Sequence, residues 1–127
     1  MPDEDIVWLE FVESKVFYRR VRELSIELLT AIQADLIENP ERGAIVVGTG
    51  GARKARVAEP GRARGKSGSY RYLYLYLPHI ERIHLLYIYG KDEQDDLSPQ
   101  QKGVLKELGQ AIRKEGRHGE GTKGEGK

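Results

Sequence analysis

Basic side chains are the groups in this sequence whose types and spacing suggest chemistry. Residues 48–71 hold seven of them against a single acid, Glu59, although the whole chain is nearly balanced, with 21 Lys and Arg against 20 Asp and Glu. A run of one sign within a small domain is typical of a surface that binds an anion. The seven are Arg53, Lys54, Arg56, Arg62, Arg64, Lys66 and Arg71.

The spacing of these cations brings three of them together. Lys54 and Arg56 are two residues apart on a predicted strand, so both project from the same face, and Arg71 begins the neighbouring strand. Tyrosines lie close by, and cations among aromatic rings suit single-stranded RNA, whose phosphates need charge and whose unstacked bases need rings. Two alternatives stay open: the cations could be solvated charges that protect a sheet edge, and each tyrosine could be a core residue.

Other chemistries find little support in the sequence. The chain has no cysteine, and His79, His84 and His118 lack the spacing of metal ligands. The acidic residues between 92 and 96 lack the glycine and terminal glutamate of an EF-hand, so we interpret them as a solvated loop before a helix. Gly48–Gly51 fits neither phosphate-loop pattern and predicts a tight turn. We therefore expect no metal and no cofactor.

The elements that would position the cations can be predicted from periodicity. The apolar run Asp5–Val12 suits a strand, and Ser14 can cap a helix in which Phe17, Val21, Leu24 and Leu28 recur at helical spacing. A second apolar series, Leu29, Ile32 and Leu36, ends at Asn39-Pro40 and Gly43. This pattern predicts either two helices or one helix bent near Ser25.

The second half of the chain has a period close to two. It predicts three strands, Arg53–Val57, Tyr70–Leu77 and Arg82–Tyr89, with a glycine-rich loop, Pro60–Ser69, between the first two. The middle strand alternates tyrosine with leucine, so each face of it should carry one type. Ser98-Pro99 opens a final helix with a capping box, and Val104, Leu105, Leu108 and Ile112 form its apolar stripe.

Length and composition set the domain organisation that we expect. A chain of 127 residues suits one domain, which we place at residues 1–115. Residues 116–127 mix glycine with polar and charged residues and offer no apolar group to bury, which predicts a disordered tail. No run is long and apolar enough for a membrane span and the acidic start is unlike a signal peptide, so we expect no membrane partner and a cytoplasmic location.

Three ordered motifs carry a resemblance to a known family. Residues Gly50–Val57, Gly65–Arg71 and Leu86–Ser98 closely resemble the RelE/ParE superfamily of bacterial toxins, in particular its HigB-like branch, over about residues 6 to 114. The resemblance implies an α+β fold: an N-terminal strand, two helices, a twisted antiparallel sheet made of a three-strand meander plus the first strand, and a C-terminal helix.

The resemblance also implies an activity. RelE-like and HigB-like toxins cleave messenger RNA on the ribosome and are silenced by a cognate antitoxin, which in HigB systems is a helix-turn-helix protein. The RNA's own 2′-hydroxyl attacks the adjacent phosphate and leaves a cyclic phosphate and a 5′-hydroxyl. Such a reaction needs positioning and positive charge on the phosphorane, which Arg, Lys and Tyr can supply.

The family's site residues map onto four positions of this chain. Lys54 and Arg56 resemble the paired basic positions of a Lys-x-Lys strand motif; Lys54 would serve proton transfer or electrostatic support. Arg71 resembles the arginine after Gly-Tyr and would stabilise transition-state charge, and Lys91 would hold a phosphate. The other basic residues and two tyrosines are expected to bind RNA. These are Arg53, Arg62, Arg64, Lys66, Tyr74 and Tyr89.

Two departures from the RelE pattern leave other functions open. Asp92 stands where RelE has an arginine, and the C-terminal tyrosine of RelE has no counterpart between Asp96 and Glu115. A non-catalytic module of the same fold, binding antitoxin or RNA, is therefore an alternative to the ribosome-dependent nuclease. A gyrase inhibitor like ParE is a further one.

Overall fold

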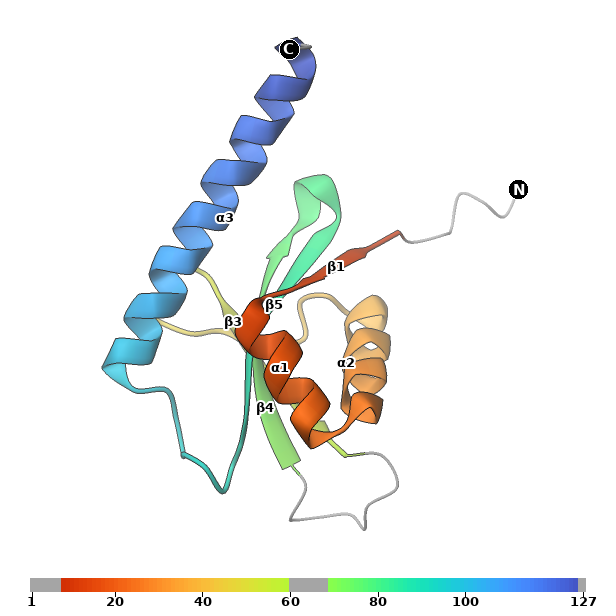
Figure 1. The fold of residues 1–127 in the computed structure, drawn as a ribbon, viewed down its shortest axis with the longest axis vertical. Coiled ribbons are helices and arrows are strands. Elements are labelled where there is room, and N and C mark those ends of the chain that lie inside the picture. The colour runs from red at the N-terminus through yellow and green to blue at the C-terminus, as the bar shows by residue number, and fades with distance from the viewer. Residues whose placement is uncertain (1–7, 60–68, 126–127) are drawn as a thin grey trace, which may run out of the picture.

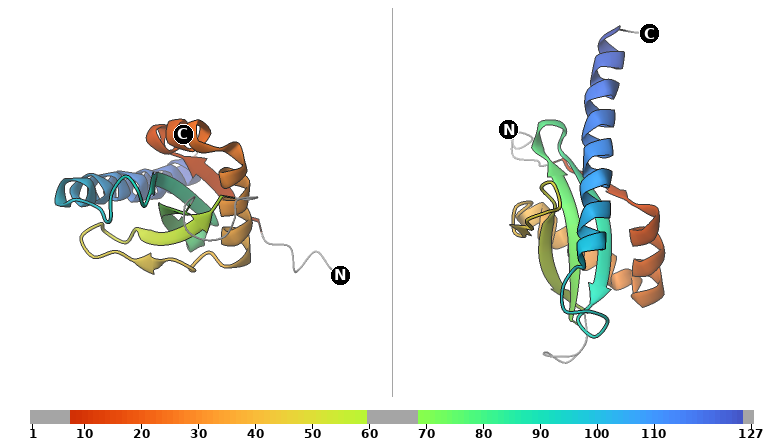
Figure 2. Two further views of the ribbon diagram at one scale, coloured as in Figure 1. Left: turned by 90° about the horizontal axis from the view of Figure 1, so that it is seen from below. Right: turned by 90° about the vertical axis from the view of Figure 1, so that its left-hand side faces the viewer.

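A five-stranded sheet separates two layers of helix (Figure 1). The structure, a computed structural model, describes residues 8–59 and 69–125, with side chains as far as residue 115. Helices α1 and α2 cover one face of the sheet and α3 covers the other, as the two views of Figure 2 show. The elements in chain order are β1 (Glu10–Glu13), α1 (Lys15–Leu24), α2 (Ile26–Glu38), β2 (Ala44–Ile45), β3 (Arg53–Ala58), β4 (Ser69–Leu77), the 3-10 turn η2 (Pro78–Ile80), β5 (Arg82–Gly90) and α3 (Pro99–Glu125).

Two serines define the first helical layer. Ser14 caps α1 as expected, because its Oγ accepts a hydrogen bond from the Phe17 N–H at 3.0 Å. Ser25 has an extended backbone and its Oγ accepts from the Glu27 N–H, so it ends α1 and caps α2. The segment therefore forms two helices rather than one bent helix.

The sheet is mixed and not wholly antiparallel. Its strand order is β1-β5-β4-β3-β2, in which β1 runs parallel to β5 and every other pair is antiparallel. The expected meander β3-β4-β5 is present, and the short β2 adds a fifth strand beside β3. The connection through α1 and α2 brings the chain back to the sheet at its far edge, which is why β1 and β3 do not pair.

β1 is shorter than the predicted strand Asp5–Val12. Residues 5–7 lie outside the described residues, and pairing begins at Glu10, opposite Arg82, and ends at Glu13, opposite Leu85. The turn η2 precedes Arg82, so β5 offers no partner for a longer β1. Apolar composition indicated a strand here but could not set where its partner begins.

The alternation of β4 divides its side chains between two cores, as predicted. Tyr72 and Tyr74 are buried under α1 and α2, whereas Leu73, Leu75 and Leu77 are buried under α3. The register with β5 shifts between Leu73 and Tyr74, because Leu73 is opposite Tyr87 and Tyr74 is opposite Leu85. Leu86 is therefore the extra residue of a bulge, and its carbonyl accepts a hydrogen bond from the Ser14 Oγ at 2.8 Å.

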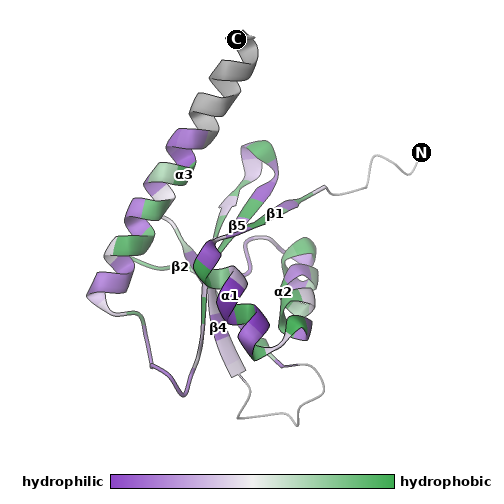
Figure 3. Cartoon of the chain, in the orientation of Figure 1, coloured by the Kyte–Doolittle hydropathy of each residue, from purple (hydrophilic) through white to green (hydrophobic). Residues whose placement is uncertain are grey.

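The last helix begins with the expected capping box. The Gln101 N–H donates to the Ser98 Oγ at 3.1 Å and the Ser98 N–H donates to the Gln101 Oε1 at 2.9 Å. Hydrophobic and hydrophilic residues alternate along α3 (Figure 3), and Leu105, Leu108 and Ile112 pack on the sheet. Val104, also expected in this stripe, is 62% exposed because it lies at the rim of the contact.

α3 extends to Glu125, through the segment 116–125 that we expected to be disordered. The helix rises beyond the sheet along most of this length (Figure 1). No helix among the described residues is both long enough and apolar enough to cross a bilayer.

Candidate functional site

Three of the four candidate catalytic residues gather on one face of the sheet. Ala55 and Val57 are buried against the α1 and α2 layer, so Lys54 and Arg56, which alternate with them, project from the face that α3 covers. Arg56 is directly opposite Arg71 in the pairing of β3 with β4. The predicted convergence of these three cations is therefore present, and we refer to Lys54, Arg56 and Arg71 as the sheet cations.

Arg56 and Arg71 form an unfavourable pair in the absence of an anion. Directly opposite residues in an antiparallel pair have Cβ atoms about 4.5–5.5 Å apart, and like charges at such positions destabilise a sheet. Arg56 is exposed, and the hydrogen bond of Arg71 to another described residue is a long one, 3.5 Å from Nη1 to Ser69 Oγ. A bound phosphate would accept hydrogen bonds from both guanidinium groups and remove their repulsion.

Lys54 is held by a carboxylate that the sequence analysis did not assign to the site. Its Nζ lies 3.2 Å from Asp96 Oδ1, and that oxygen also accepts a hydrogen bond from the Leu97 N–H at 2.8 Å. The Leu97 N–H and the Lys54 ammonium lower the pKa of Asp96. The Asp96 side chain is 60% exposed, as expected of a solvated loop, and its carboxylate also holds Lys54 beside the two arginines.

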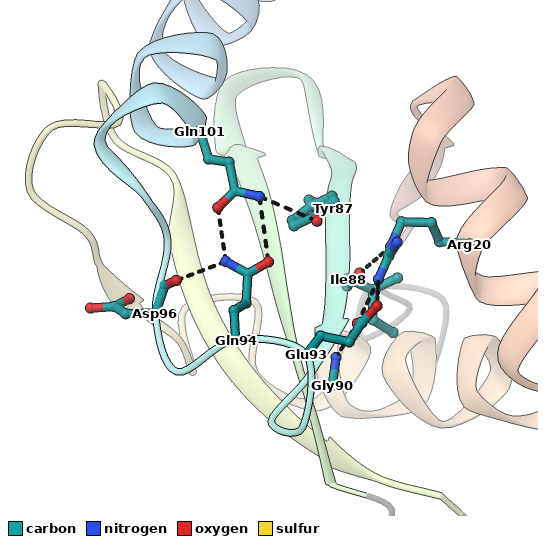
Figure 4. A network of polar contacts seen from close by, with 8 residues as sticks. All are labelled: Arg20, Tyr87, Ile88, Gly90, Glu93, Gln94, Asp96 and Gln101. Atoms are coloured by element: carbon teal, nitrogen blue, oxygen red, sulfur yellow. Dashed lines mark hydrogen bonds and ion pairs between the residues drawn. The ribbon is translucent and has the colours of Figure 1, made fainter.

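The loop that carries Asp96 is tied to the fold at both ends (Figure 4). At one end Glu93 accepts two hydrogen bonds from Arg20 Nη2, at 2.6 and 2.7 Å, and one from the Gly90 N–H at 2.7 Å. Arg20 Nε in turn donates to the Ile88 carbonyl at 2.6 Å. The Arg20 contact, followed by the Gly90 N–H, lowers the pKa of Glu93.

At the other end of this loop, an amide pair connects it to α3 and β5. Gln94 Nε2 donates to the Asp96 carbonyl at 2.7 Å and to Gln101 Oε1 at 2.8 Å. Gln101 Nε2 donates to Tyr87 Oη at 3.4 Å (Figure 4). The acidic loop is thus a clamp that fixes the position of Asp96, and through it the position of Lys54.

Lys91 lies at the same end of the sheet as Arg71. Its N–H donates to the Ser69 carbonyl at 3.4 Å, two residues from Arg71, and its side chain is exposed. Lys91 is the first residue after β5 and precedes the clamped loop. Its backbone position is therefore fixed near the sheet cations.

Tyr74 does not belong to this site. It is wholly buried on the opposite face of the sheet, where its Oη donates to the Pro40 carbonyl at 2.8 Å and accepts from the Gly43 N–H at 2.9 Å. Burial raises its pKa, so the hydroxyl stays protonated. The expectation that Tyr74 stacks on an RNA base is wrong for this structure, because its ring is part of the core.

Tyr89 lies on the expected face but is also buried. It is directly opposite Arg71, it is wholly buried, and its Oη has no hydrogen-bond partner within the described part of the chain. Burial raises its pKa, the Asp96 carboxylate adds to that rise and Arg71 opposes it. A ring without exposed surface cannot stack on a base, so the stacking role expected of Tyr89 is not available in this conformation.

Arg53 is separated from the sheet cations by the alternation of its strand. It faces the α1 and α2 side, where its Nη1 donates to the carbonyls of Gly43 at 2.7 Å and Glu41 at 3.3 Å. These contacts hold the connection after α2, so Arg53 does not join the anion-binding face. Three further residues expected to bind RNA, Arg62, Arg64 and Lys66, lie outside the described residues.

An apolar groove of about 300 Å³ lies apart from the sheet cations, between the start of α1 and the first turns of α3. Its lining includes Val16, Leu86, Val104 and Leu108, which offer little to a phosphate. Within the described residues, no three His, Cys, Asp or Glu side chains are close enough together to hold a metal ion. The sheet cations, in contrast to this groove, suit electrostatic work on an anionic substrate.

Comparisons with known proteins agree with this fold. Residues 11–119 match the family described as the RelE toxin of the RelE/RelB toxin–antitoxin system. A structure of the E. coli toxin RelE in the free state, a mutant with two arginines replaced by alanine, is similar to this chain with a TM-score of 0.50 and 13% sequence identity. That similarity covers 68% of this chain and 87% of the RelE chain, and at this identity it is a likeness of fold.

Proposed function

This chain belongs to the RelE toxin family, and from that membership and its sheet cations we propose that it is a ribosome-dependent mRNA endoribonuclease. Its partners would be the ribosome, the messenger RNA and a cognate helix-turn-helix antitoxin, all in the cytoplasm. The residues Lys91–Ser98, with their acidic loop, support placing it in the HigB-like branch. The observation that carries the proposal is the Arg56–Arg71 pair, with Lys54 beside it on the same face.

The proposed reaction is the attack of an RNA 2′-hydroxyl on the adjacent phosphate. The 2′-oxygen forms a bond to phosphorus as its proton passes to a water molecule. The bond to the 5′-oxygen breaks and that oxygen takes up a proton, so a cyclic phosphate and a 5′-hydroxyl result. Arg71 would bind the non-bridging oxygens through its fixed fork of donors, with Arg56 opposite it. Because charge on these oxygens grows in the transition state, the two guanidinium groups stabilise that state more than the substrate.

Lys54 would support the leaving group in this reaction. Lys54 Nζ lies 3.2 Å from the Asp96 carboxylate, on the face that carries Arg56 and Arg71, and we assign it the donation of a proton to the departing 5′-oxygen. Asp96 would act as a positioning residue, because it holds Lys54 without contacting RNA itself. Lys91 would bind a neighbouring phosphate at the same end of the sheet.

Cleavage of ribosome-bound message by wild type and two variants tests the proposal. We expect Arg71→Ala to lower the cleavage rate by about 10²–10³, the usual loss for a group that stabilises transition-state charge. Arg19→Ala is the matched control, because Arg19 is an exposed arginine on α1, on the other face of the sheet. New 5′ ends that appear at the wild-type rate with folded Arg71→Ala would show that the site assignment is wrong.

A non-catalytic binding module is the second candidate, and the burial of both tyrosines favours it. With Tyr74 and Tyr89 wholly buried and Lys54 paired with Asp96, the described residues offer cations for binding RNA but no exposed ring at the site. Such a module would bind message and ribosome without generating new 5′ ends. Primer extension on the wild-type reaction separates the two functions, and DNA damage with intact RNA would instead indicate a gyrase inhibitor.

A further inference from the structure

A row of cations on α3 faces the glycine turn that joins β2 to β3. Lys102, Lys106 and Arg113 follow one another at intervals of four and seven residues, which places them on one stripe of the helix. Gly109 lies on the same stripe, and a β-carbon there would be 4.0 Å from the Thr49 carbonyl oxygen. We call Lys102, Lys106 and Arg113 the α3 cations.

The turn is built so that the α3 cations can lie against it. Gly48, Gly50 and Gly51 all have positive φ, at 91°, 71° and 108°, which L side chains rarely adopt. A β-carbon at Gly50 would lie 3.3 Å from Lys106 Cγ, and one at Gly48 would lie 3.6 Å from Lys102 Cδ. The aliphatic stems of the two lysines therefore pack on the bare backbone of the turn.

Within the described residues, neither lysine has an acid close enough for an ion pair, and the Asp96 carboxylate acts on Lys102 only at longer range. Neither side chain forms an ion pair or hydrogen bond with any described residue. Like charges four residues apart on a helix destabilise it by about 0.2–0.5 kcal/mol, so their placement does not serve the helix. Arg113, the last residue of the row, has a structural contact, because its Nη1 donates to the Gly50 carbonyl at 2.7 Å.

The α3 cations continue from the sheet cations. Asp96 connects the two groups, because it contacts Lys54 directly and the charge of Lys102 contributes to lowering its pKa. From Lys102 to Arg113 the row spans about 16 Å of helix, at 1.5 Å per residue. A strand that leaves the sheet cations in this direction would pass Asp96, whose carboxylate is paired with Lys54, and would then meet the α3 cations.

We propose that Lys102 and Lys106, with Arg113 and the turn 48–51, form a second phosphate-binding surface that holds the backbone of the single-stranded RNA beyond the scissile phosphate. The proposal rests on the proposed function, because the direction of the strand is taken from the site at Arg56 and Arg71. Its ligand chemistry is the phosphodiester backbone, so it carries no sequence preference. It differs from the sheet cations in that it binds and positions RNA without touching the reacting atoms.

The salt dependence of RNA binding tests this surface without requiring cleavage. The probe is a labelled single-stranded RNA of about ten nucleotides with every 2′-hydroxyl methylated, within the range of strand lengths that one domain covers. It cannot be cleaved by 2′-hydroxyl attack, and no ribosome is present. Fluorescence anisotropy gives the binding affinity at each salt concentration, and a plot of log affinity against log salt concentration gives a slope. The magnitude of this slope falls by about 0.7 for each phosphate of a single strand that the protein no longer binds.

The double variant carries Lys102→Gln and Lys106→Gln in the full chain. We expect the magnitude of its slope to be about 1.4 smaller than that of wild type, and its affinity near 0.1 M salt to be roughly 25-fold lower. Glutamine has nearly the helix propensity of lysine, so an unchanged melting temperature would verify the fold. Lys114→Gln is the matched control, because Lys114 is an exposed lysine of the same helix about 100° around its axis from Arg113. Its slope should equal that of wild type.

An unchanged slope in the double variant, or an equal reduction in the Lys114→Gln control, would overturn the inference. Absence of measurable binding by wild type at low salt would do the same. A failed proposed function has a different signature: Arg71→Ala would leave cleavage unchanged, or no cleavage would occur, while the double variant still showed its reduced slope. If Arg71→Ala abolishes cleavage and the lysine variants bind like wild type, this inference alone is wrong.

Discussion

The hydroxyl of Tyr74 should stabilise the fold by an amount that can be worked out from its two hydrogen bonds. It donates to the Pro40 carbonyl and accepts from the Gly43 N–H, and both residues belong to the connection that follows α2. Tyr74→Phe keeps the ring in the core and removes only the oxygen. The two hydrogen bonds that this variant cannot form are worth about 1 kcal/mol each, and the buried Gly43 N–H left without a partner adds to the cost.

We therefore expect Tyr74→Phe to lower the free energy of unfolding by about 2–3 kcal/mol. For a chain of this length that corresponds to a fall in melting temperature of roughly 10 °C. Urea unfolding followed by circular dichroism measures the change, and an unaltered slope on urea concentration would show that the denatured state is unaffected.

Tyr89→Phe is the contrasting variant in the same experiment. Tyr89 is equally buried, but its hydroxyl has no partner among the described residues, so removing the oxygen relieves a desolvated group instead of breaking bonds. We expect this variant to be neutral or more stable by up to about 1 kcal/mol. The reasoning would be refuted if the two variants lost the same stability, or if Tyr74→Phe lost less than about 1 kcal/mol.

Three further predictions concern the turn, α3 and the clamped loop. Gly51→Ala should destabilise the fold by about 1–3 kcal/mol, because Gly51 has φ 108° and a β-carbon would lie 2.7 Å from Arg113 Nη2. Gly103→Ala, in open space on α3, should stabilise the fold by about 0.5–1 kcal/mol. Thermal unfolding measures both changes, and a stabilising Gly51→Ala or a destabilising Gly103→Ala would contradict the respective prediction. The contacts of Glu93 with Arg20 and the Gly90 N–H lower its pKa below the ordinary 4.5. The ionised carboxylate of Glu93 therefore stabilises the fold above pH 4.5, and this contribution is lost as pH falls through the lowered pKa. Stability measured against pH should therefore fall less steeply in acid for Glu93→Gln than for wild type or for the exposed control Glu107→Gln, and parallel curves would show that the clamp does not couple to protonation.

Local patterns in the sequence predicted most of the fold. Ser14 and the Ser98–Gln101 box cap helices because capping depends on residues a few positions apart, and the tyrosine–leucine alternation of β4 follows from the pleat. The parallel pairing of β1 with β5 was missed, because no local pattern states which neighbour a strand chooses or in which direction it runs.

The candidate site could be predicted only in part, for the same physical reason. Lys54 and Arg56 share a face by strand geometry alone, but the partner of Lys54 is 42 residues away, on a loop whose position depends on Arg20 and Gln101. The alternation of side chains along a strand also predicts which face of the sheet a tyrosine occupies, but it does not predict whether another layer covers that face. Tyr74 belongs to the core between the sheet and the α1 and α2 layer, and Tyr89 belongs to the core on the α3 side; both cores form only when the layers pack.

The opposed arginines of β3 and β4 have a consequence for how long the protein survives. Without an anion, the repulsion between Arg56 and Arg71 lowers the stability of the free chain, and any polyanion or acidic surface placed over them removes that cost. A partner present at a hundred times its dissociation constant adds about 2.7 kcal/mol to the stability, which lowers the unfolded fraction about 100-fold. Free toxin would thus be the form most open to proteolysis, and occupancy of this one face would set both its activity and its lifetime.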